Sequence, residues 1–563
     1  MTTPHPLERY LQALDRLEPT FELKSNRTFN QVFNQVSSQA SGQASGQALD
    51  SSPICWSNRL SQAALERLQA TTQSTHWEEP ETALDINNIA VMALLDAEQA
   101  SEPMLRSMTI EMAIEALSQG ARIGHPLCIA HLAMVHSLMG EADTAFQLAF
   151  QGLIENLQPA YQAESLPIGL VYLPANSQSQ VTRSETLHQV LEAADGYHQA
   201  LQIFAAVLCQ IQLVFYNPSG QRFLQVALQL HPNAIGLNLK QGIANLLNQQ
   251  WEGLLHLHQA QAMAPQSALL VQALYLAYRS LQPDLAAAWW QYGQTCAAAA
   301  PTSADWQWLQ LPADAPFTYL KLGSLPIAVE PSLRSIVTSV LLAEGDWFEA
   351  EMELWRDQLQ SGMTVIDVGA NVGVYTFSAA QRVGSSGCVI AVEPFSGCVR
   401  CLEETKRLNQ LDWVTIRAGA ASDCQGTARL ALRSASELNE LVTADQPIEG
   451  EFEEVPCFPL DSLIDSIGMT QLDWLKIDAE GHEMQVLQGS ERLLTEFQPA
   501  ILYENIAGAS ASNTPVAVYL QSKGYRLFRY QPYLKNLIPV NSLEDLRQSL
   551  NVIALPADRC PSD

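Results

Sequence analysis

Residues 363–373 read Met-Thr-Val-Ile-Asp-Val-Gly-Ala-Asn-Val-Gly, an apolar run that ends in an aspartate and two glycines. We expect a buried β-strand that turns at Gly369 and Gly373 and runs into an amphipathic helix near Val374. In open sheets of parallel strands, ligands bind beyond the carboxyl ends of the strands, at turns of this kind. The stretch therefore predicts a strand–turn–helix unit with a ligand site beside Asp367.

The glycine spacing separates two classes of ligand. A dinucleotide-binding turn carries Gly-x-Gly-x-x-Gly, so that a helix N-terminus can receive the pyrophosphate. Here the pattern is Asp-x-Gly-x-x-x-Gly, from Asp367 to Gly373, with Asn371 in the turn. S-adenosylmethionine has no phosphate; it carries an ammonium, a sulfonium and a ribose diol, which an acidic residue at a strand end complements. The spacing favours this cofactor and argues against a nicotinamide-dependent dehydrogenase.

A second carboxylate, Glu393, ends the next predicted strand, which reads Val-Ile-Ala-Val-Glu. A carboxylate there can accept hydrogen bonds from both ribose hydroxyls. Either acidic residue alone could be a helix cap or a solvated strand end, but two acidic residues at the ends of two apolar strands predict one pocket. We predict that the cofactor-binding residues of this pocket include Asp367, Gly369, Asn371, Gly373 and Glu393.

Further strands are predicted around this unit. The apolar and β-branched candidates after residue 301 are 364–368, 388–392, 414–418, 474–477, 501–504, 525–530 and 551–555. Helical patterns separate most of the early candidates, which indicates parallel βαβ units. No helix of comparable strength separates the last two, which suggests an antiparallel edge strand. We expect an α/β domain with a mostly parallel, seven-stranded sheet and an antiparallel edge strand.

Residues 332–556 resemble the FkbM family of methyltransferases, class I Rossmann-like enzymes that transfer a methyl group from S-adenosylmethionine, typically to a hydroxyl oxygen. The matching segments are 345–351, 365–374, 392–394, 459–463, 475–483, 502–504, 523–525 and 551–554. The resemblance implies a Rossmann-like fold, methyltransferase activity and S-adenosylmethionine as the cofactor. It also implies that Asp478, after the fourth strand, lies beside the methionine end of the cofactor.

Three carboxylates and one histidine follow the fourth predicted strand: Asp478, Glu480, His482 and Glu483. An alcohol acceptor needs a route for its proton, and His482 has the ordinary pKa best suited to a general base. Asp478 or Glu480 can do the same work if burial raises its pKa. We predict Asp478, His482 and Glu480 as catalytic residues, with Glu504 second to them; a surface position at a helix start is the alternative for His482.

Two further groups of residues follow from the resemblance and from helical periodicity. Ala421 and Asp423 follow the third strand, where such folds commonly contact adenine, so we predict both as cofactor-binding residues, although Asp423 could equally cap a turn. In residues 346–359, Phe348 and three other apolar side chains form one helical stripe that core packing explains, and the roles of Glu349 and Glu351 stay open. A divalent metal held by the acidic cluster remains an alternative, but we predict no metal ligands.

The sequence before residue 301 is different in character. From about Trp56 to Ala300 it is rich in Ala, Leu and Gln with helical periodicity, so we expect only helices there. Residues 130–153 predict two helices joined by a tight turn, and residues 164–183 predict a long loop. Prolines 33 residues apart, Pro232 and Pro265, each follow an alanine by five residues, which weakly resembles tetratricopeptide (TPR-like) repeats.

Length and composition limit the number of domains and the classes of partner. The chain has 563 residues, which suggests several domains, and its net charge of -29 would repel nucleic acid and anionic membranes. We predict a helical segment with a Ser/Gln/Ala/Gly-rich linker over 1–52, a helical-repeat domain over 53–303 and a methyltransferase domain over 304–563. The N-terminus does not read as a signal peptide, and the most apolar long run, residues 201–216, is interrupted by two glutamines, so we expect no membrane span. The ten sparse cysteines suggest a reducing cytoplasm.

These features predict a cytoplasmic, S-adenosylmethionine-dependent O-methyltransferase acting on a hydroxyl of a saccharide, a glycolipid or a secondary metabolite. The helical repeats would bind a protein partner or present the acceptor. Two alternatives remain: N- or carboxyl-methylation of a protein or small molecule, and a scaffold whose methyltransferase domain is inactive. The sequence identifies neither the acceptor nor the oligomeric state.

Overall fold

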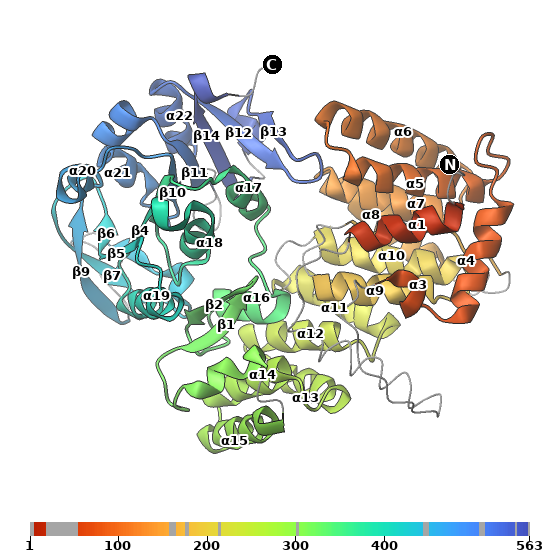
Figure 1. Cartoon of the computed structure of the whole chain (residues 1–563), viewed down its shortest axis with the longest axis horizontal. Helices are drawn as coiled ribbons and strands as arrows, with labels where there is room; N and C mark the ends of the chain where they lie inside the picture. Colours follow the sequence, from red (N-terminus) through yellow and green to blue (C-terminus); the bar gives the residue numbers. More distant parts are fainter. Residues whose placement is uncertain are drawn as a thin grey trace. The chain divides into compact units, whose positions relative to one another are not determined.

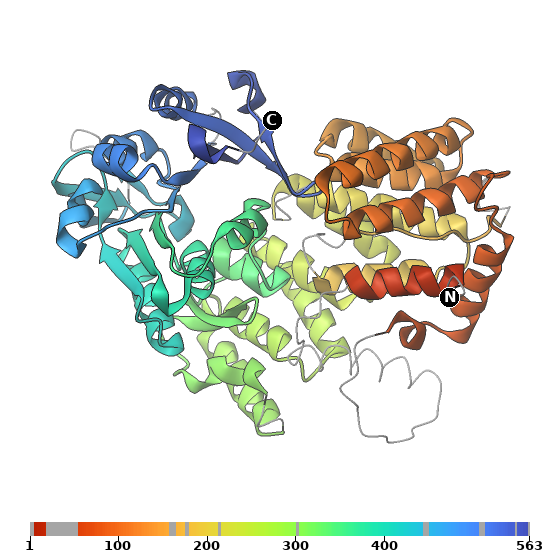
Figure 2. The ribbon, with the colours of Figure 1, turned by 45° about the horizontal axis from the view of Figure 1, so that its top comes forward.

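The structure is a computed structural model of the chain. The residues that it describes are 5–17, 55–156, 165–174, 180–211, 216–299, 303–442, 450–505, 513–546 and 549–560. The chain divides into two compact units, Met1–Trp306 and Gln307–Asp563, which are described separately below. Both are drawn in Figures 1 and 2.

Within its described residues, the first unit consists of helices and irregular segments, as the periodicity predicted. The helices are α1 (Pro6–Leu17), α3 (Trp56–Arg59), α4 (Gln62–Ser74), α5 (Ala83–Gln99), α6 (Pro103–Arg122), α7 (Pro126–Leu138), α8 (Ala142–Asn156), α9 (Gln180–Leu191), α10 (Gly196–Ile211), α11 (Pro218–Leu230), α12 (Ile235–Leu247), α13 (Gly253–Met263), α14 (Ala268–Arg279) and α15 (Pro283–Ala299). Local signals start several of them: Thr82 and Asp85, for example, form a capping box at α5. The predicted linker lies outside the described residues.

The predicted turn between two helices is present, with Gly140 at φ 82° between α7 and α8. The 33-residue spacing also has a structural counterpart, because α12 begins at Ile235 and α14 at Ala268. The helices before them, α11 and α13, end alike, on His231 and Ala264 with closely similar backbone angles. Membership of the tetratricopeptide class remains a prediction.

The segment predicted as a long loop is irregular over residues 165–174, but its end was placed wrongly, since α9 begins at Gln180. Most of the irregular segment is buried, which is unusual for a loop. Side chains replace water as partners of its backbone: Asn88 accepts from the Leu170 N–H at 2.8 Å, and Gln199 accepts from the Gly169 N–H at 2.8 Å. This buried segment is part of the core of the first unit.

The second unit is built on an eight-stranded mixed sheet, within the described residues, in the order β13-β12-β14-β11-β10-β3-β4-β5. Its strands are β3 (Thr364–Val368), β4 (Cys388–Glu393), β5 (Val414–Ala418), β10 (Trp474–Ile477), β11 (Ala500–Glu504), β12 (Tyr525–Gln531), β13 (Asn536–Pro539) and β14 (Asn551–Pro556). All seven predicted strands are present to within one residue. The hydrogen-bonded neighbours from β5 through β4, β3 and β10 to β11 are parallel.

The predicted seven-stranded sheet was wrong in its number of strands. The sheet has an eighth strand, β13, which pairs antiparallel with β12 and forms an antiparallel edge. Antiparallel pairing also extends further into the sheet than expected, because β14 lies antiparallel between β11 and β12. The apolar pattern of residues 551–555 could not reveal this position, since a strand paired on one side and a strand paired on both sides show the same burial along the chain.

Smaller elements complete the second unit. Its helices are α16 (Ile336–Glu344), α17 (Glu351–Gln358), α18 (Val374–Val383), α19 (Ser396–Asn409), α20 (Asp461–Ile467), α21 (Glu483–Gln488) and α22 (Thr514–Ser522). A four-stranded sheet is formed by β6 (Ala420–Ala421), β7 (Gly426–Ala431), β8 (Glu440–Val442) and β9 (Phe452–Phe458), and a hairpin by β1 (Thr318–Leu322) and β2 (Leu325–Val329). Among the described residues, none of the helices combines the length and apolarity needed to cross a bilayer.

Candidate active site

Three neighbouring parallel strands of the large sheet, β10, β3 and β4, have a carboxylate at or just after their carboxyl ends. Asp367 lies on β3, opposite Lys476 of β10 and Ala391 of β4 in the register. Two residues further along the neighbouring strands stand Asp478 and Glu393. Because the strands are parallel, these side chains converge beyond the carboxyl ends of the strands, where ligands of such sheets bind.

The turn from β3 to α18 uses its own backbone N–H groups. Gly369 and Ala370 both donate to the Val392 carbonyl, at 3.0 and 3.1 Å, and Gly373 donates to the Ala370 carbonyl at 2.8 Å. The N–H of Asn371 donates to Glu393 and that of Val372 to the Asn371 side chain, each at 2.8 Å. A phosphate-binding loop instead directs such groups at its ligand. The turn is therefore not built to hold a phosphate.

Glu393 is fixed by two backbone N–H groups, from Asn371 to Oε2 and from Phe395 to Oε1, both at 2.8 Å. A carboxylate can accept about four hydrogen bonds, so each oxygen keeps capacity for a ligand hydroxyl. Burial is the main cause that raises the pKa of Glu393 to about 7. The Glu393 carboxylate is therefore held in place, and its oxygens can accept further hydrogen bonds.

Asp367 is fully buried at the base of the site. Thr376 donates its hydroxyl to Oδ2 at 2.6 Å, while Oδ1 has no hydrogen-bond partner among the described residues. Burial raises the pKa of Asp367, against the lowering effect of the nearby Lys476 ammonium. Two glycines flank its turn. A Cβ on the second, Gly373, would lie 2.4 Å from Phe377 of α18 and 2.7 Å from Leu402 of α19, so the glycine leaves room for these two side chains.

Lys476 is a site residue that the sequence analysis missed. Its side chain is only 4% exposed, with Nζ 2.9 Å from Asp478 Oδ2 and 4.0 Å from Asp367 Oδ1. Nζ also lies 4.6 Å from the ring centroid of Tyr375. Burial alone would lower the pKa of Lys476, but the surrounding carboxylates, Asp478 first, raise it above its ordinary value. A lysine inside the buried strand β10 was the available signal, because a charge is not buried without a partner.

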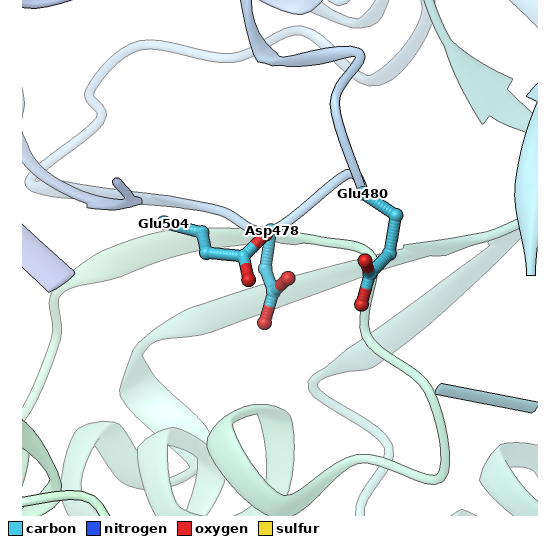
Figure 3. A group of neighbouring side chains, drawn as sticks. All are labelled: Asp478, Glu480 and Glu504. Atoms are coloured by element: carbon cyan, nitrogen blue, oxygen red, sulfur yellow. The ribbon is translucent and has the colours of Figure 1, made fainter. Parts of the chain in front are cut away.

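Three carboxylates face one another beyond Lys476: Asp478, Glu480 and Glu504 (Figure 3). One oxygen from each lies within 4.8 Å of the others. Burial is the main cause that raises the pKa of Glu480 to about 8 and that of Glu504 to about 10, and repulsion from Asp478 adds to both. Such oxygens could also hold a divalent cation, but an acidic cluster alone does not establish a metal site.

Carboxyl groups therefore outnumber cationic groups among the described residues of this site. Burial raises the pKa of each of five carboxyl groups, those of Glu349, Asp367, Glu393, Glu480 and Glu504. The cation that offsets four of them, all but Glu393, is Lys476. A ligand that brings positive charge would relieve this repulsion.

Residues 367–527 match the family model described as the methyltransferase FkbM domain. The second unit contains an FkbM methyltransferase domain. The match confirms the resemblance seen in the sequence, over a shorter range. No curated protein matches the chain.

Solved structures also resemble the FkbM domain. An FkbM methyltransferase from Methylobacillus flagellatus KT is 15% identical, with a TM-score of 0.24, over 39% of this chain and 55% of its own. This chain thus covers only about half of that protein. A SAM-dependent methyltransferase from Aquifex aeolicus is 18% identical, with a TM-score of 0.21, over 37% of this chain and 89% of its own.

The FkbM domain places His482 apart from the three carboxylates. His482 precedes α21, and its Nε2 lies 3.0 Å from the hydroxyl of Ser422. Burial lowers the pKa of His482, against the raising effect of Asp423. Ala421 is buried in β6, whereas Asp423 is exposed, 3.3 Å from the Ser422 hydroxyl. The predicted catalytic set thus separates into Asp478 and Glu480, which lie together, and His482, which faces the loop after β6.

Glu483, the third carboxylate of the predicted cluster, supports the backbone. It is buried, and its Oε1 accepts hydrogen bonds from the N–H groups of Ala479 and Gly481, both at 3.0 Å. Asn513 donates to its other oxygen at 2.9 Å. These bonds hold the loop that carries Glu480, so Glu483 shapes the site of the FkbM domain without facing its centre.

The segment before β3 brings two more carboxylates, Glu349 and Glu351, close to the site. Tyr375 donates its hydroxyl to Glu349 Oε2 at 2.5 Å, and Asn551 donates to Glu349 at 3.1 Å and to Glu351 at 3.4 Å. Burial is the main cause that raises the pKa of Glu351 to about 7. The predicted apolar stripe is only partly helical, because α17 begins at Glu351 and Phe348 precedes it.

Proposed function

We propose that the FkbM domain binds S-adenosylmethionine and methylates a hydroxyl oxygen of a saccharide, a glycolipid or a secondary metabolite. The observation that carries the proposal is the convergence of Asp367, Glu393 and Asp478 at the sheet edge of a domain that matches a methyltransferase family. The remaining arguments concern the fit of the cofactor and of the acceptor.

The residues present fit the cofactor. Glu393 would accept hydrogen bonds from the ribose hydroxyls, and Asp367 and Asp478 would face the positively charged methionine end. Because the N–H groups of the turn at 369–373 are already bonded, a ligand without phosphate suits it. Ala421 and Asp423 remain our candidates for contacts near adenine. When bound, S-adenosylmethionine supplies a methyl group on a sulfonium, which is open to in-line attack by an oriented nucleophile.

The acceptor side is bounded by Asp478, Glu480 and Glu504 (Figure 3). Asp478 accepts a hydrogen bond from Lys476 Nζ at 2.9 Å, which holds its side chain in place. Glu480 and Glu504 would then orient the acceptor hydroxyl and receive its proton at a carboxylate oxygen. A positive ligand nearby lowers their pKa values toward the working range. We therefore replace His482 with Glu504 in the proposed catalytic set.

The same carboxylates make N-methylation the second candidate. A protonated amine would be attracted by Asp478, Glu480 and Glu504 and could lose its proton to one of them. A carboxylate acceptor would be repelled by the same groups, which argues against carboxyl methylation. The site therefore favours hydroxyl and amine acceptors over acidic ones.

For the rest of the chain we keep two proposals. The helical unit is proposed to be a TPR-like repeat domain that binds a protein partner or presents the acceptor, because helix arrays offer extended surfaces. A reducing cytoplasm is proposed as the location, because all ten cysteines are free thiols.

The test of cofactor binding is calorimetry of the full chain with S-adenosylmethionine. Glu393→Gln should weaken binding about tenfold to a hundredfold, the worth of hydrogen bonds to a charged group. Asp367→Asn should weaken it too, while Glu403→Gln, an exposed control on α19, should not. No binding by the folded wild-type chain would refute the proposal.

The test of the acceptor uses labelled S-adenosylmethionine with a panel of sugars, amines and carboxylic acids, followed by an extract of the protein's own cell. Methylated sugars support the first proposal and methylated amines the second. If the chain binds the cofactor and yet methylates nothing in the panel or the extract, the scaffold alternative replaces both.

A further inference from the structure

Helix α6 of the first unit carries an exposed line of methionines. Met104, Met108 and Met112 are spaced by four residues and are 76%, 56% and 68% exposed, and Leu105 beside them is 53% exposed. Residues four apart lie one above another on a helix, so the three methionines form a continuous ridge. We call these four residues the methionine stripe. Figure 1 shows α6 within the helical unit.

The stripe is separate from the face that α6 packs inward. That face is formed by Ile110, Ala113 and Leu117, which are buried. Core packing therefore accounts for one side of the helix only. Single exposed apolar side chains are common on soluble proteins, but a contiguous apolar ridge marks an interaction surface. Methionine suits such a surface, because its flexible, polarisable side chain adapts to differently shaped partners.

The charges around the stripe are acidic. Glu102, Glu111 and Glu115 are exposed, and the last two lie on the same side of α6 as the methionines. Arg106 is turned away and buried, and its guanidinium donates to the carbonyls of Ala97, Glu98 and Ala100 at the end of α5. The other basic residue of α6, Arg122, lies in its last turn, beyond the stripe.

These charges select among possible occupants. A second copy of the chain, at a net charge of -29, would bring Glu111 and Glu115 against their own counterparts. An anionic lipid surface would be repelled for the same reason. A helix with an apolar face and basic residues along its rim would place its apolar side chains on the methionines and its cations against the glutamates.

We infer that the methionine stripe of α6 is a docking site for a basic amphipathic helix of a partner protein. The apolar contact supplies the attraction, and the glutamates set the charge and orientation of the partner. This inference is independent of the methyltransferase proposal, since it concerns the helical unit alone.

The test is fluorescence anisotropy of the full chain with a labelled 18-residue helical peptide of Leu and Lys, in which Leu recurs at helical spacing. We expect the wild-type chain to bind it, and Met108→Ser/Met112→Ser to weaken binding tenfold or more. Leu255→Ser on α13, where Leu255 is 71% exposed, is the matched control and should bind as wild type does. Because all three side chains are exposed, circular dichroism should show unchanged folding.

A second arm tests charge. Glu111→Gln/Glu115→Gln should weaken the same binding several-fold at low salt and reduce its salt dependence. The inference is overturned if the methionine variant binds the peptide as wild type does, or if a Leu/Glu peptide binds equally well. It is also overturned if the methionine variant instead abolishes self-association in sedimentation, or abolishes flotation with phosphatidylcholine/phosphatidylglycerol vesicles, without changing peptide binding.

Discussion

Gly369 and Asp478 meet so closely that a Cβ on the glycine would lie 1.6 Å from the aspartate carbonyl oxygen. The two residues are 109 positions apart in the sequence, but they follow β3 and β10, which are hydrogen-bonded neighbours in the sheet. Asp478 also donates its N–H to the Val368 carbonyl at 3.1 Å. The turn at residues 369–373 and the loop that follows β10 are therefore in direct backbone contact.

Replacing Gly369 should disturb both sides at once. Gly369→Ala places a methyl group against the Asp478 carbonyl and strains a backbone at φ 71°. We expect a loss of about 3 kcal/mol in unfolding free energy and of cofactor binding, measured by urea unfolding and calorimetry. Gly481→Ala is the matched control: its φ is 93°, but no atom lies within 4 Å, so only the strain remains, about 1 kcal/mol. Equal losses in the two variants would contradict this prediction.

The ion pair of Lys476 should matter far more than a surface pair. Lys476→Met leaves Asp478 and Asp367 buried or half-buried without their cation, and we expect a loss of about 3 kcal/mol in unfolding free energy. Arg382→Met, which breaks an exposed pair with Asp357, should cost about 1 kcal/mol or less. Adding Asp478→Asn to Lys476→Met should recover part of the lost unfolding free energy. If the losses of the two single variants simply add in the double variant, the Lys476–Asp478 pair is contradicted.

Proton transfer should depend on the carboxylates rather than on the histidine. Glu504→Gln keeps the shape of the side chain but cannot accept the acceptor's proton, so kcat should fall roughly 10²- to 10⁴-fold with little change in cofactor affinity. His482→Gln should change kcat by much less, because Nε2 faces Ser422. The prediction is checked by methyl-transfer kinetics across pH. It is wrong if His482→Gln loses the activity and Glu504→Gln retains it.

Binding of a cationic cofactor should release protons. Glu393 and Glu480, with pKa values of about 7 and 8, are partly protonated near neutral pH in the free protein. Positive charge favours their ionised forms, so affinity should rise with pH between about 6 and 8. Calorimetry in phosphate and in Tris reveals the protons through the different ionisation enthalpies of the two buffers. Identical heats in both buffers would exclude the release.

The stability of the free protein should fall as pH rises, whereas cofactor affinity should increase. The pKa of Glu393 is raised in the folded chain from 4.5 to about 7, so the folded state keeps the proton up to a higher pH than the unfolded state does. The stability that this proton contributes is complete below pH 4.5 and is lost as pH rises to 7. Glu393→Gln should flatten this part of the pH dependence, whereas Glu403→Gln should leave it unchanged.

In the first unit, side chains that bond the buried segment 165–174 should be essential for stability. Asn88→Ala removes the acceptor of the Leu170 N–H and leaves that group unsatisfied, at a cost of about 2 kcal/mol. Hydrogen exchange should show loss of protection at the Leu170 amide. Gln73→Ala, exposed on α4, is the control and should leave exchange unchanged. Retained protection in Asn88→Ala would mean that the side chain does not bind the segment.

Local patterns were sufficient for much of this description. The alternation of apolar runs and helical stretches identified the strands that end at Asp367, Glu393 and Asp478 almost to the residue. The glycine spacing identified a turn without phosphate donors, and the backbone bonding of residues 369–373 agrees with it. These features depend on hydrogen bonds and burial within a few residues, which the sequence shows directly.

Local sequence patterns did not predict which distant residues contact one another. Nothing local distinguishes Glu504, which faces Asp478, from Glu483, which bonds its own loop. Likewise, no pattern in residues 164–183 showed that side chains of five helices, α1, α4, α5, α7 and α10, would bond a buried backbone segment.

The sequence by itself determined which residues form strands, turns and helices, because propensity and periodicity act over short range. The tertiary structure decided which carboxylates meet, that Lys476 lies between Asp367 and Asp478, and that β14 runs between β11 and β12. The physical reason is that strand order and charge pairing depend on which distant segments pack together, and many pairings are compatible with the same local pattern.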